Sequence, residues 1–194
     1  MRALVALFRP RHRRSRISRR QPTRRESVAG VESARGVSAR GLGLALAALA
    51  LALDQASKYA ITHGFEAGAM HAGALAPFLD LALRFNRGVS FSLLPQDGAL
   101  GAALLTSFSL GVVAVLTIWL WRVKSRMTGA GLGLIIGGAL GNAADRAAYG
   151  AVVDFLDLHA LGRHFFVFNL ADAAISAGVA LLIVEGLFAE GRKG

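Results

Sequence analysis

The sequence predicts an all-α membrane protein with four transmembrane helices. Apolar residues make up 54% of the chain and the mean hydropathy is +0.50, both high for a soluble domain. Four apolar segments are each long enough to cross a bilayer, which takes ~20 residues for a ~30 Å core. The predicted organisation is a membrane domain over residues 41–190, preceded by a tail over residues 1–40.

The tail carries the charge of the whole chain. Residues 1–40 contain twelve Arg and two Glu, whereas residues 41–194 contain ten Lys or Arg and ten Asp or Glu, so the formal charge of +10 belongs to the tail. Its Arg- and Ser-rich composition predicts a disordered cytosolic segment attracted to anionic lipid, although an organellar transit peptide has a similar composition. No nucleic-acid-binding pattern is present, and we expect no nucleic-acid partner.

The four predicted spans cover approximately residues 41–62, 99–121, 128–147 and 167–189. Basic residues flank them unevenly, and cytoplasmic loops are the ones enriched in Lys and Arg. The three basic groups fall on one side of the predicted membrane: Arg35 and Arg40, then Arg122, Lys124 and Arg126, then Arg192 and Lys193. Both termini are therefore predicted to be cytoplasmic.

Two outer loops then face the other compartment. In the first, Leu79–Phe85 and Val89–Leu94 are apolar and are separated by the turn-forming Asn86-Arg87-Gly88, which predicts a small β-hairpin or sheet on the membrane surface. In the second, Val152–Leu158 predicts a short amphipathic segment at the interface.

The third span contains a stripe of small residues. Gly129, Gly133, Gly137 and Gly141 recur every four residues, and Asp145 is the next position of the series. Such a stripe allows another helix to approach closely, so packing alone accounts for the glycines. It does not account for Asp145, because a carboxylate at a membrane boundary is costly and is a functional candidate.

The fourth span begins with a second carboxylate. Asp172, Ser176 and Ala180 form a small, polar stripe at the same four-residue spacing. If the third and fourth spans pack through their stripes, Asp145 and Asp172 meet at the outer surface. Two adjacent carboxylates share a proton, and such a pair can activate water to attack an amide. The alternative is that the aspartates cap helices or pair with Arg, since Asp is favoured in a first helical turn.

Other polar residues are fewer. Asp54 and Lys58 have the i,i+4 spacing of a helical ion pair, which by itself explains both. The chain has no Cys, which excludes disulfides and thiolate chemistry. His159 and His164 lack an obvious third ligand, so we expect neither a metal nor another cofactor.

Four sequence blocks, in order, resemble the bacterial lipoprotein signal peptidases, or signal peptidase II. They are D-Q-A-S-K (Asp54–Lys58), N-R-G-V-S-F (Asn86–Phe91), G-N-A-A-D-R-A-A-Y-G-A-V-V-D-F (Gly141–Phe155) and F-N-L-A-D-A-A-I (Phe168–Ile175). The resemblance covers about residues 42–188. One departure is Ser90, which stands where the family usually has Ala.

The resemblance implies a monomeric aspartic endopeptidase of the bacterial inner membrane, with its active site at the extracytoplasmic face. Its substrates would be prolipoproteins bearing a diacylglyceryl-modified Cys, held by membrane lipids and cut just before that Cys. Asp145 and Asp172 would correspond to the catalytic pair. The remaining site residues that the resemblance implies are Asn142 and Asn169, which would orient the pair or contact substrate, and Asp54, Lys58, Asn86, Gly88, Arg146 and Asp154, which would line the site.

Three other functions compete with this hypothesis. A proton-linked carrier would use the aspartates as a relay, but it predicts carboxylates near mid-membrane and internal repeats. A scaffold subunit would use the glycine stripe alone and would tolerate Asp145→Asn. An intramembrane protease of the G-x-G-D type is closer in chemistry, but that motif precedes neither Asp145 nor Asp172.

Overall fold

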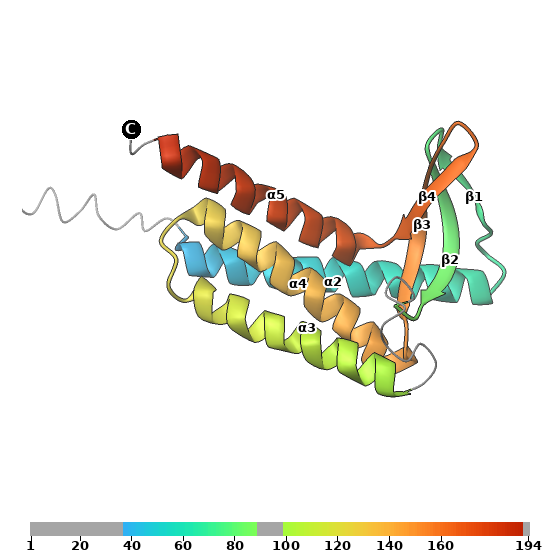
Figure 1. Ribbon diagram of the computed structural model, residues 1–194. Coiled ribbons are helices and arrows are strands. Elements are labelled where there is room, and N and C mark those ends of the chain that lie inside the picture. Colours follow the sequence, from blue (N-terminus) through green and yellow to red (C-terminus); the bar gives the residue numbers. More distant parts are fainter. Residues whose placement is uncertain (1–36, 89–98, 192–194) are drawn as a thin grey trace, which may run out of the picture. The chain divides into compact units, whose positions relative to one another are not determined.

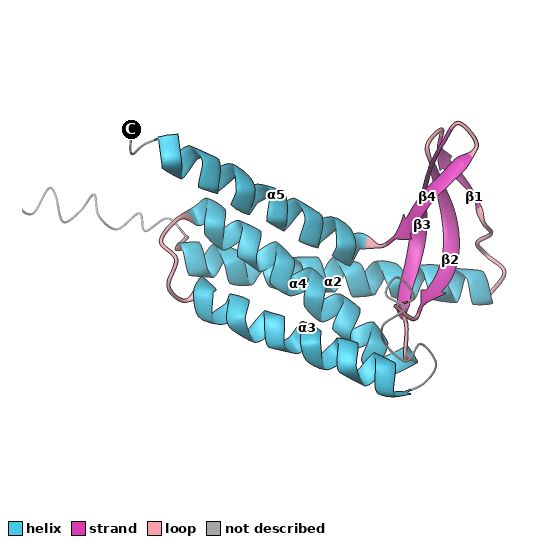
Figure 2. Cartoon of the chain, in the orientation of Figure 1, coloured by secondary structure: helices cyan, strands magenta, loops and turns pink. Residues whose placement is uncertain are grey.

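The computed structural model describes residues 37–88 and 99–191. Within this part the chain forms four long helices and one sheet (Figures 1 and 2). The helices are α2 (Ala39–Glu66), α3 (Ala99–Leu120), α4 (Arg126–Tyr149) and α5 (Leu170–Gly191). All four are long and apolar enough to cross a membrane, which confirms the predicted spans. The predicted tail lies outside the described residues up to residue 36, and Ala39 and Arg40 already belong to α2.

Side-chain caps and a glycine define the ends of two helices. The Ser38 hydroxyl accepts a hydrogen bond from the Gly41 amide before α2, and the Ser125 hydroxyl accepts one from the Thr128 amide before α4. Helix α4 ends at Gly150, whose φ of 69° lies in the left-handed region that favours glycine. This sharp ending directs the chain from α4 into a strand two residues later.

The glycine stripe of α4 packs against α2. A side chain at Gly129, Gly133 or Gly137 would collide with the α2 backbone, at Ala39, Gly43 and Ala47 respectively. The condition considered from the sequence, that this stripe packs against the fourth span, is therefore not met. All the glycines of the stripe lie on one side of α4, and that side is occupied by α2.

Helix α5 packs on a different side of α4, through other small residues. Gly138 lies against Ala171 at the start of α5, and Gly131 lies against Gly178 further along. In the predicted α5 stripe, Ser176 and Ala180 are exposed and Asp172 is half-buried. Because α4 presents small residues on two sides, it lies between α2 and α5 and has the most buried residues of the four helices (Figure 1).

Both loops at one end of the helices contribute to a single antiparallel sheet. Its strands are β1 (Gly73–Ala76), β2 (Leu79–Asn86), β3 (Val152–Ala160) and β4 (Arg163–Phe168), in that spatial order. A strand at Leu79–Phe85 was predicted, whereas its predicted partner Val89–Leu94 lies outside the described residues. The strands that pair with β2 are β1 and β3.

The second loop differs from its prediction. The segment expected to be a short amphipathic piece is strand β3, whose Asp154 is the register partner of Arg84 on β2. The fourth helix begins at Leu170 rather than near Val167, because Val167 and Phe168 pair with β3 as part of β4. The sheet thus joins two loops that are far apart in the sequence and fixes β3 beside the helix ends.

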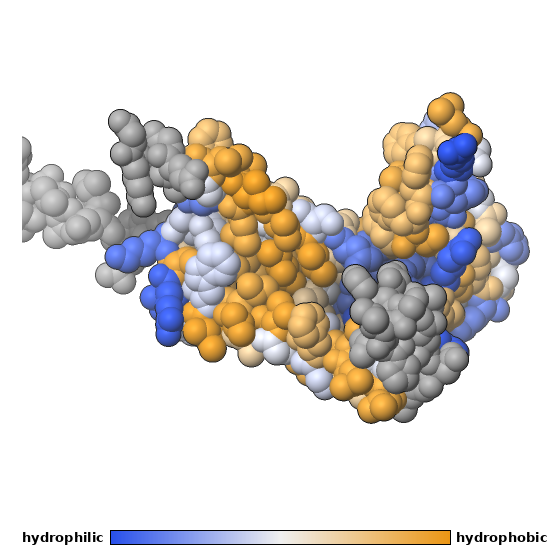
Figure 3. Space-filling view, viewed as in Figure 1, coloured by the Kyte–Doolittle hydropathy of each residue, from blue (hydrophilic) through white to orange (hydrophobic). Residues whose placement is uncertain are grey.

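The outer surfaces of the helices are apolar (Figure 3). Large exposed side chains cover α3, including Leu104, Phe108 and Val115, and α5, including Ile183 and Leu187. A small buried core connects the helices at Ala47, Leu120, Leu132 and Ile136. An apolar exterior around a small-residue interior is the pattern expected when lipid, and not water, surrounds the helices.

We expect Gly133→Val to destabilise the protein. A side chain at Gly133 collides with the backbone of Gly43, which cannot move without separating α2 from α4. Overpacking of this kind costs about 1–3 kcal/mol, measurable as a lower midpoint of thermal unfolding in detergent. Gly111→Val is the matched control, because no atom lies within 4 Å of a Cβ at that α3 position. Equal midpoints for the two variants would contradict this packing.

Candidate active site

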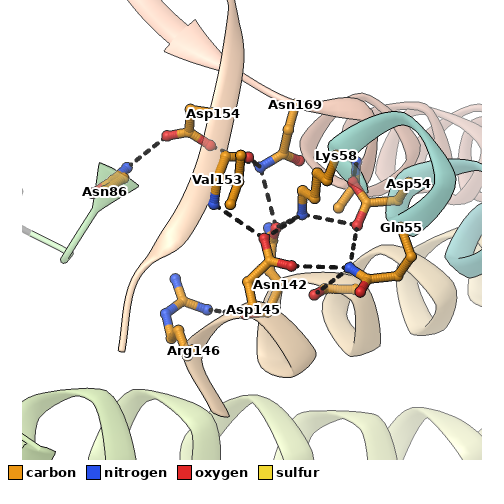
Figure 4. A network of polar contacts seen from close by, with 12 residues as sticks. Asp54, Gln55, Lys58, Asn86, Asn142, Asp145, Arg146, Val153, Asp154 and Asn169 are labelled. Atoms are coloured by element: carbon orange, nitrogen blue, oxygen red, sulfur yellow. Dashed lines mark hydrogen bonds and ion pairs between the residues drawn. The ribbon is translucent and has the colours of Figure 1, made fainter. Parts of the chain in front are cut away.

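A buried ion cluster lies between α2 and α4, near their ends next to the sheet (Figure 4). The Lys58 ammonium lies 2.8 Å from Asp54 Oδ2 and 2.7 Å from Asp145 Oδ2. The side chains of Lys58, Asp54 and Asp145 expose only 4%, 0% and 2% of their surfaces. The predicted Asp54–Lys58 pair therefore forms, but it is not self-contained, because Asp145 shares the same ammonium.

The remaining oxygens of the two carboxylates are also occupied. Gln55 Nε2 donates to Asp145 Oδ1 at 2.9 Å, to Asp54 Oδ2 at 3.2 Å and to the Gly141 carbonyl at 3.2 Å. Asp145 Oδ2 also accepts from the Val153 amide at 3.0 Å. Asp54 Oδ1 accepts from the Ala171 amide at 2.9 Å. Each buried carboxylate thus reaches from its own helix to the backbone of another element.

Asparagine side chains connect this cluster to two further carboxylates. Asn142 Oδ1 accepts from Lys58 at 3.1 Å, while its Nδ2 donates to Asp172 Oδ1 at 2.8 Å. Asn169 Nδ2 donates to Asp154 Oδ1 at 2.7 Å, to Asn142 Oδ1 at 3.2 Å and to the Val153 carbonyl at 3.2 Å. Asp154 and Asp172 are therefore joined through the same two amides.

Asp172 also shapes the start of α5. The Asn169 side chain accepts from the Asp172 amide at 3.0 Å, and Asp172 Oδ2 accepts from the Asn169 amide at 3.2 Å. This reciprocal pair has the geometry of a capping box, so the capping role considered for Asp172 is present. The other carboxylate oxygen of Asp172, Oδ1, takes no part in the capping box and accepts a hydrogen bond from Asn142.

Asp154 lies on β3 at the edge of the cluster and is 3% exposed. Asn86 Nδ2, from β2, donates to its second oxygen at 3.0 Å, and Asn86 Oδ1 accepts from the Gly88 amide at 2.9 Å. Burial raises the pKa of Asp154 above its ordinary value, and the neighbouring charge of Asp172 raises it further. The hydrogen bonds from Asn86 and Asn169, and the charge of Lys58, oppose this rise in the pKa.

Arg146 follows Asp145 on α4 and lies near Asp145, Asp154 and Asp172, close enough to interact with their charges. Its Nη1 donates to the Asn142 carbonyl at 3.4 Å. Its Nε is buried and has no hydrogen-bond partner among the described residues. A buried N–H without a partner is costly, and a substrate carbonyl is one group that can satisfy it.

All ten site residues expected from the sequence lie in this one region. They are Asp54, Lys58, Asn86, Gly88, Asn142, Asp145, Arg146, Asp154, Asn169 and Asp172. Gln55 was missed, although a polar amide inside an otherwise apolar span signals a buried partner. His159 and His164 instead bond Asp80 and Asp157 on the sheet, and no cluster suited to a metal ion occurs among the described residues.

Four membrane-length helices with buried carboxylates at one end define a multi-pass membrane protein with a candidate hydrolytic site. Residues 46–188 match the family model described as signal peptidase (SPase) II. The lipoprotein signal peptidase of Methylobacterium radiotolerans is 50% identical over 151 residues, covering 78% of this chain and 88% of that one. The corresponding protein of Beijerinckia indica is 47% identical over 154 residues, covering 79% and 92%.

Solved structures agree with these sequence matches. A structure described as a bacterial membrane enzyme at 2.3 Å resolution superposes with a TM-score of 0.65 and 26% identity, covering 79% of this chain and 92% of that one. A second, at 1.9 Å, gives a TM-score of 0.64 and 27% identity, covering 76% and 93%. The chain belongs to the signal peptidase II family and is thus a bacterial multi-pass membrane protease.

We expect Lys58→Met to be strongly destabilising. It removes the ammonium between Asp54 and Asp145 and leaves two buried carboxylates close together. Breaking a buried ion pair costs about 3–5 kcal/mol, which thermal unfolding in detergent would report. Lys124→Met is the control, because Lys124 is exposed in the α3–α4 loop and forms no ion pair among the described residues. Equal stability of the two variants would mean that the buried cluster is not formed.

Proposed function

We propose that this protein removes signal peptides from diacylglyceryl-modified prolipoproteins, and that Asp154 and Asp172 form its catalytic pair. The substrate class follows from the family. The pair follows from one observation: both carboxylates are held by the same residue, Asn169, whose side chain donates to Asp154 and whose backbone amide donates to Asp172. This assignment replaces Asp145, the partner of Asp172 expected from the sequence, with Asp154.

The contacts of Asp145 argue against a catalytic role. Its two oxygens accept from Gln55, from the Val153 amide and from the Lys58 ammonium. Its Oδ2 contacts both the Lys58 ammonium, at 2.7 Å, and the Val153 amide, so both lone pairs of that oxygen are already used.

Asp154 and Asp172 have different environments. The raised pKa of Asp154, which results first from burial, favours the protonated acid. Asp172 is half-buried and accepts hydrogen bonds from Asn142 Nδ2 and the Asn169 amide. Two neighbouring carboxylates with different surroundings divide into an acid and a base.

The reaction then needs only water and these two groups. Ionised Asp172 takes a proton from water as the water oxygen attacks the scissile carbonyl carbon, and Asp154 donates its proton to the carbonyl oxygen. This gives a neutral gem-diol. One diol hydroxyl returns its proton to Asp154 while Asp172 protonates the nitrogen, and the C–N bond breaks. Both aspartates regain their starting states without an acyl-enzyme.

Arg146 and Asn86 complete the proposed site. The buried Nε of Arg146 can donate to a carbonyl of the substrate backbone near the scissile bond. Asn86 is held on β2 by the turn at Gly88, whose φ of 85° favours glycine, and it keeps the Asp154 side chain directed toward the sheet. The proposed active form is a monomer, as the sequence resemblance implies.

The basic residues support a site at the extracytoplasmic face of the inner membrane. Arg40 stacks over the Trp121 ring at 5.6 Å, so the start of α2 and the end of α3 meet on the side of Arg122 and Lys124. That side is cytoplasmic by the positive-inside rule, which also places both termini there. The carboxylates lie at the opposite ends of the helices, where lipid chains on the modified Cys would hold the adjacent peptide bond at the membrane surface.

Replacement of either proposed catalytic acid should strongly slow cleavage. In Asp154→Asn and Asp172→Asn the amide can neither donate an acidic proton nor accept one. We expect cleavage of a diacylglyceryl-modified prolipoprotein to fall by about 10²–10⁴-fold, the range typical of acid–base catalysis. The measurement is the rate of signal-peptide release by purified, folded protein in detergent.

Asp157→Asn is the matched control for this prediction, because Asp157 is a buried aspartate on the same strand but bonds His164. It should keep the parental rate. Cleavage at the parental rate by a folded Asp154→Asn variant would contradict the proposed pair and favour Asp145 as the partner of Asp172.

Asn86→Ala should move the alkaline limb of the pH–rate profile to higher pH. The Asn86 amide stabilises the ionised form of Asp154 and so lowers the pKa of that carboxyl. Its removal raises the pKa, and Asp154 then stays protonated, and active as an acid, to higher pH. The measurement is kcat/KM against pH, with Asp80→Asn at the far end of β2 as control. A shift to lower pH would show that Asp154 is not the proton donor.

A further inference from the structure

Two buried carboxylates hold the backbone immediately before the two proposed catalytic acids. Asp145 accepts from the amide of Val153, which precedes Asp154. Asp54 accepts from the amide of Ala171, which precedes Asp172. We call Asp54 and Asp145 the carboxylate clamp. Each clamp bond lies one residue from a catalytic side chain. The distance between the two clamp carboxylates therefore controls the backbone positions from which the catalytic side chains extend.

Two side chains of α2 connect the clamp carboxylates to each other. Lys58 contacts Oδ2 of both, and Gln55 Nε2 contacts Asp54 Oδ2 and Asp145 Oδ1. An ammonium is a point charge on a flexible stem and attracts without imposing direction. The planar amide of Gln55 has two N–H bonds in fixed directions, so it imposes orientation as well as distance.

Gln55 contacts a different oxygen of Asp145 from the one that Lys58 and the Val153 amide contact. Lys58 and the Val153 amide both contact Oδ2 of Asp145, and the one contact to Oδ1 among the described residues comes from Gln55. Without Gln55, Oδ1 loses this contact, and the orientation of the carboxylate at the Val153 amide is less constrained. Gln55 also donates to the Gly141 carbonyl on α4, which anchors its own amide.

The helices are built to admit this arrangement. A side chain at Gly141 would collide with the Asp54 carboxylate, so glycine is needed where Asp54 lies against α4. Gln55 then spans from α2 to two acceptors on α4 within hydrogen-bond distance.

We propose that Gln55 is a positioning residue, which ties Asp54 to Asp145 and thereby sets the separation of the catalytic carboxylates Asp154 and Asp172. This inference rests on the proposed function, because it takes those two aspartates as the catalytic pair. Gln55 itself does not touch the reacting atoms. Its effect reaches the chemistry through the two backbone amides that the clamp holds.

The test is the kinetics of Gln55→Met, which keeps the length and helix preference of the side chain and removes the amide. We expect kcat to fall about 10–100-fold, since a misplacement of about 1 Å costs on the order of 10²-fold. KM should stay within about threefold, because the substrate does not contact the clamp. Ser57→Ala is the control, since within the described part of the chain the Ser57 hydroxyl bonds only the carbonyl of Asp54 in its own helix.

The pH profile separates positioning from a general loss of stability. Like charges in proximity raise the pKa at which the second carboxylate ionises, and that effect weakens as the two groups move apart. The charges of Lys58, Arg146, Asp54 and Asp145 remain in Gln55→Met. The alkaline limb of kcat against pH should therefore move to lower pH, while the acid limb stays in place.

Each outcome decides the proposal. Parental kcat and pH profile in Gln55→Met would overturn the positioning role, while inactive Asp154→Asn and Asp172→Asn variants would leave the catalytic pair standing. Cleavage at the parental rate by Asp154→Asn would instead overturn the pair itself. Should Gln55→Met fail to fold, Gln55→Asn is judged by the same criteria, because its amide is one methylene too short to reach both carboxylates.

Discussion

The ammonium of Lys58, buried between Asp54 and Asp145, is the interaction on which the site depends. Neither carboxylate could remain at this depth without it, since an isolated charge in a low-dielectric interior costs several kcal/mol. The ammonium in turn requires α2 and α4 to be in contact, which the glycines of α4 allow. Helix packing and ion pairing are thus one constraint: Gly141 gives room for Asp54, and Asp54 and Asp145 then hold the backbone of α5 and β3.

The four helices could be predicted because length and hydropathy alone decide what crosses a bilayer. The partner of a glycine stripe could not, because small residues permit close approach without specifying the neighbour. Gly133 faces Gly43 on α2, and α5 uses Gly131 and Gly138 on another side of α4. The sheet was predicted only in part. The strand at Val152–Ala160 could not be recognised from an alternation of apolar and polar residues, because its first four residues are all buried, on both faces of the strand.

The site residues could be located but not given their roles. Spacing brought Asp145 and Asp172 to the same end of two helices, and the sequence blocks gathered all ten residues. Spacing says nothing about which hydrogen-bond donors a carboxylate meets. Three donors occupy Asp145, while a strand pairing between segments about seventy residues apart brings Asp154 beside Asn86. That pairing is a tertiary event, invisible in the periodicity of either segment.

The i,i+4 spacing of Asp54 and Lys58 has a consequence for how the chain enters the membrane. Helix α2 is the first described span to be synthesised, and it carries both charges before α4 and Asp145 exist. Because the pair is local to one helix turn, it can form as soon as α2 does, which lowers the cost of placing each charge in lipid. When α4 follows, its Asp145 meets an ammonium already in place. The order of residues along the chain therefore matches the order in which charges can be neutralised during insertion.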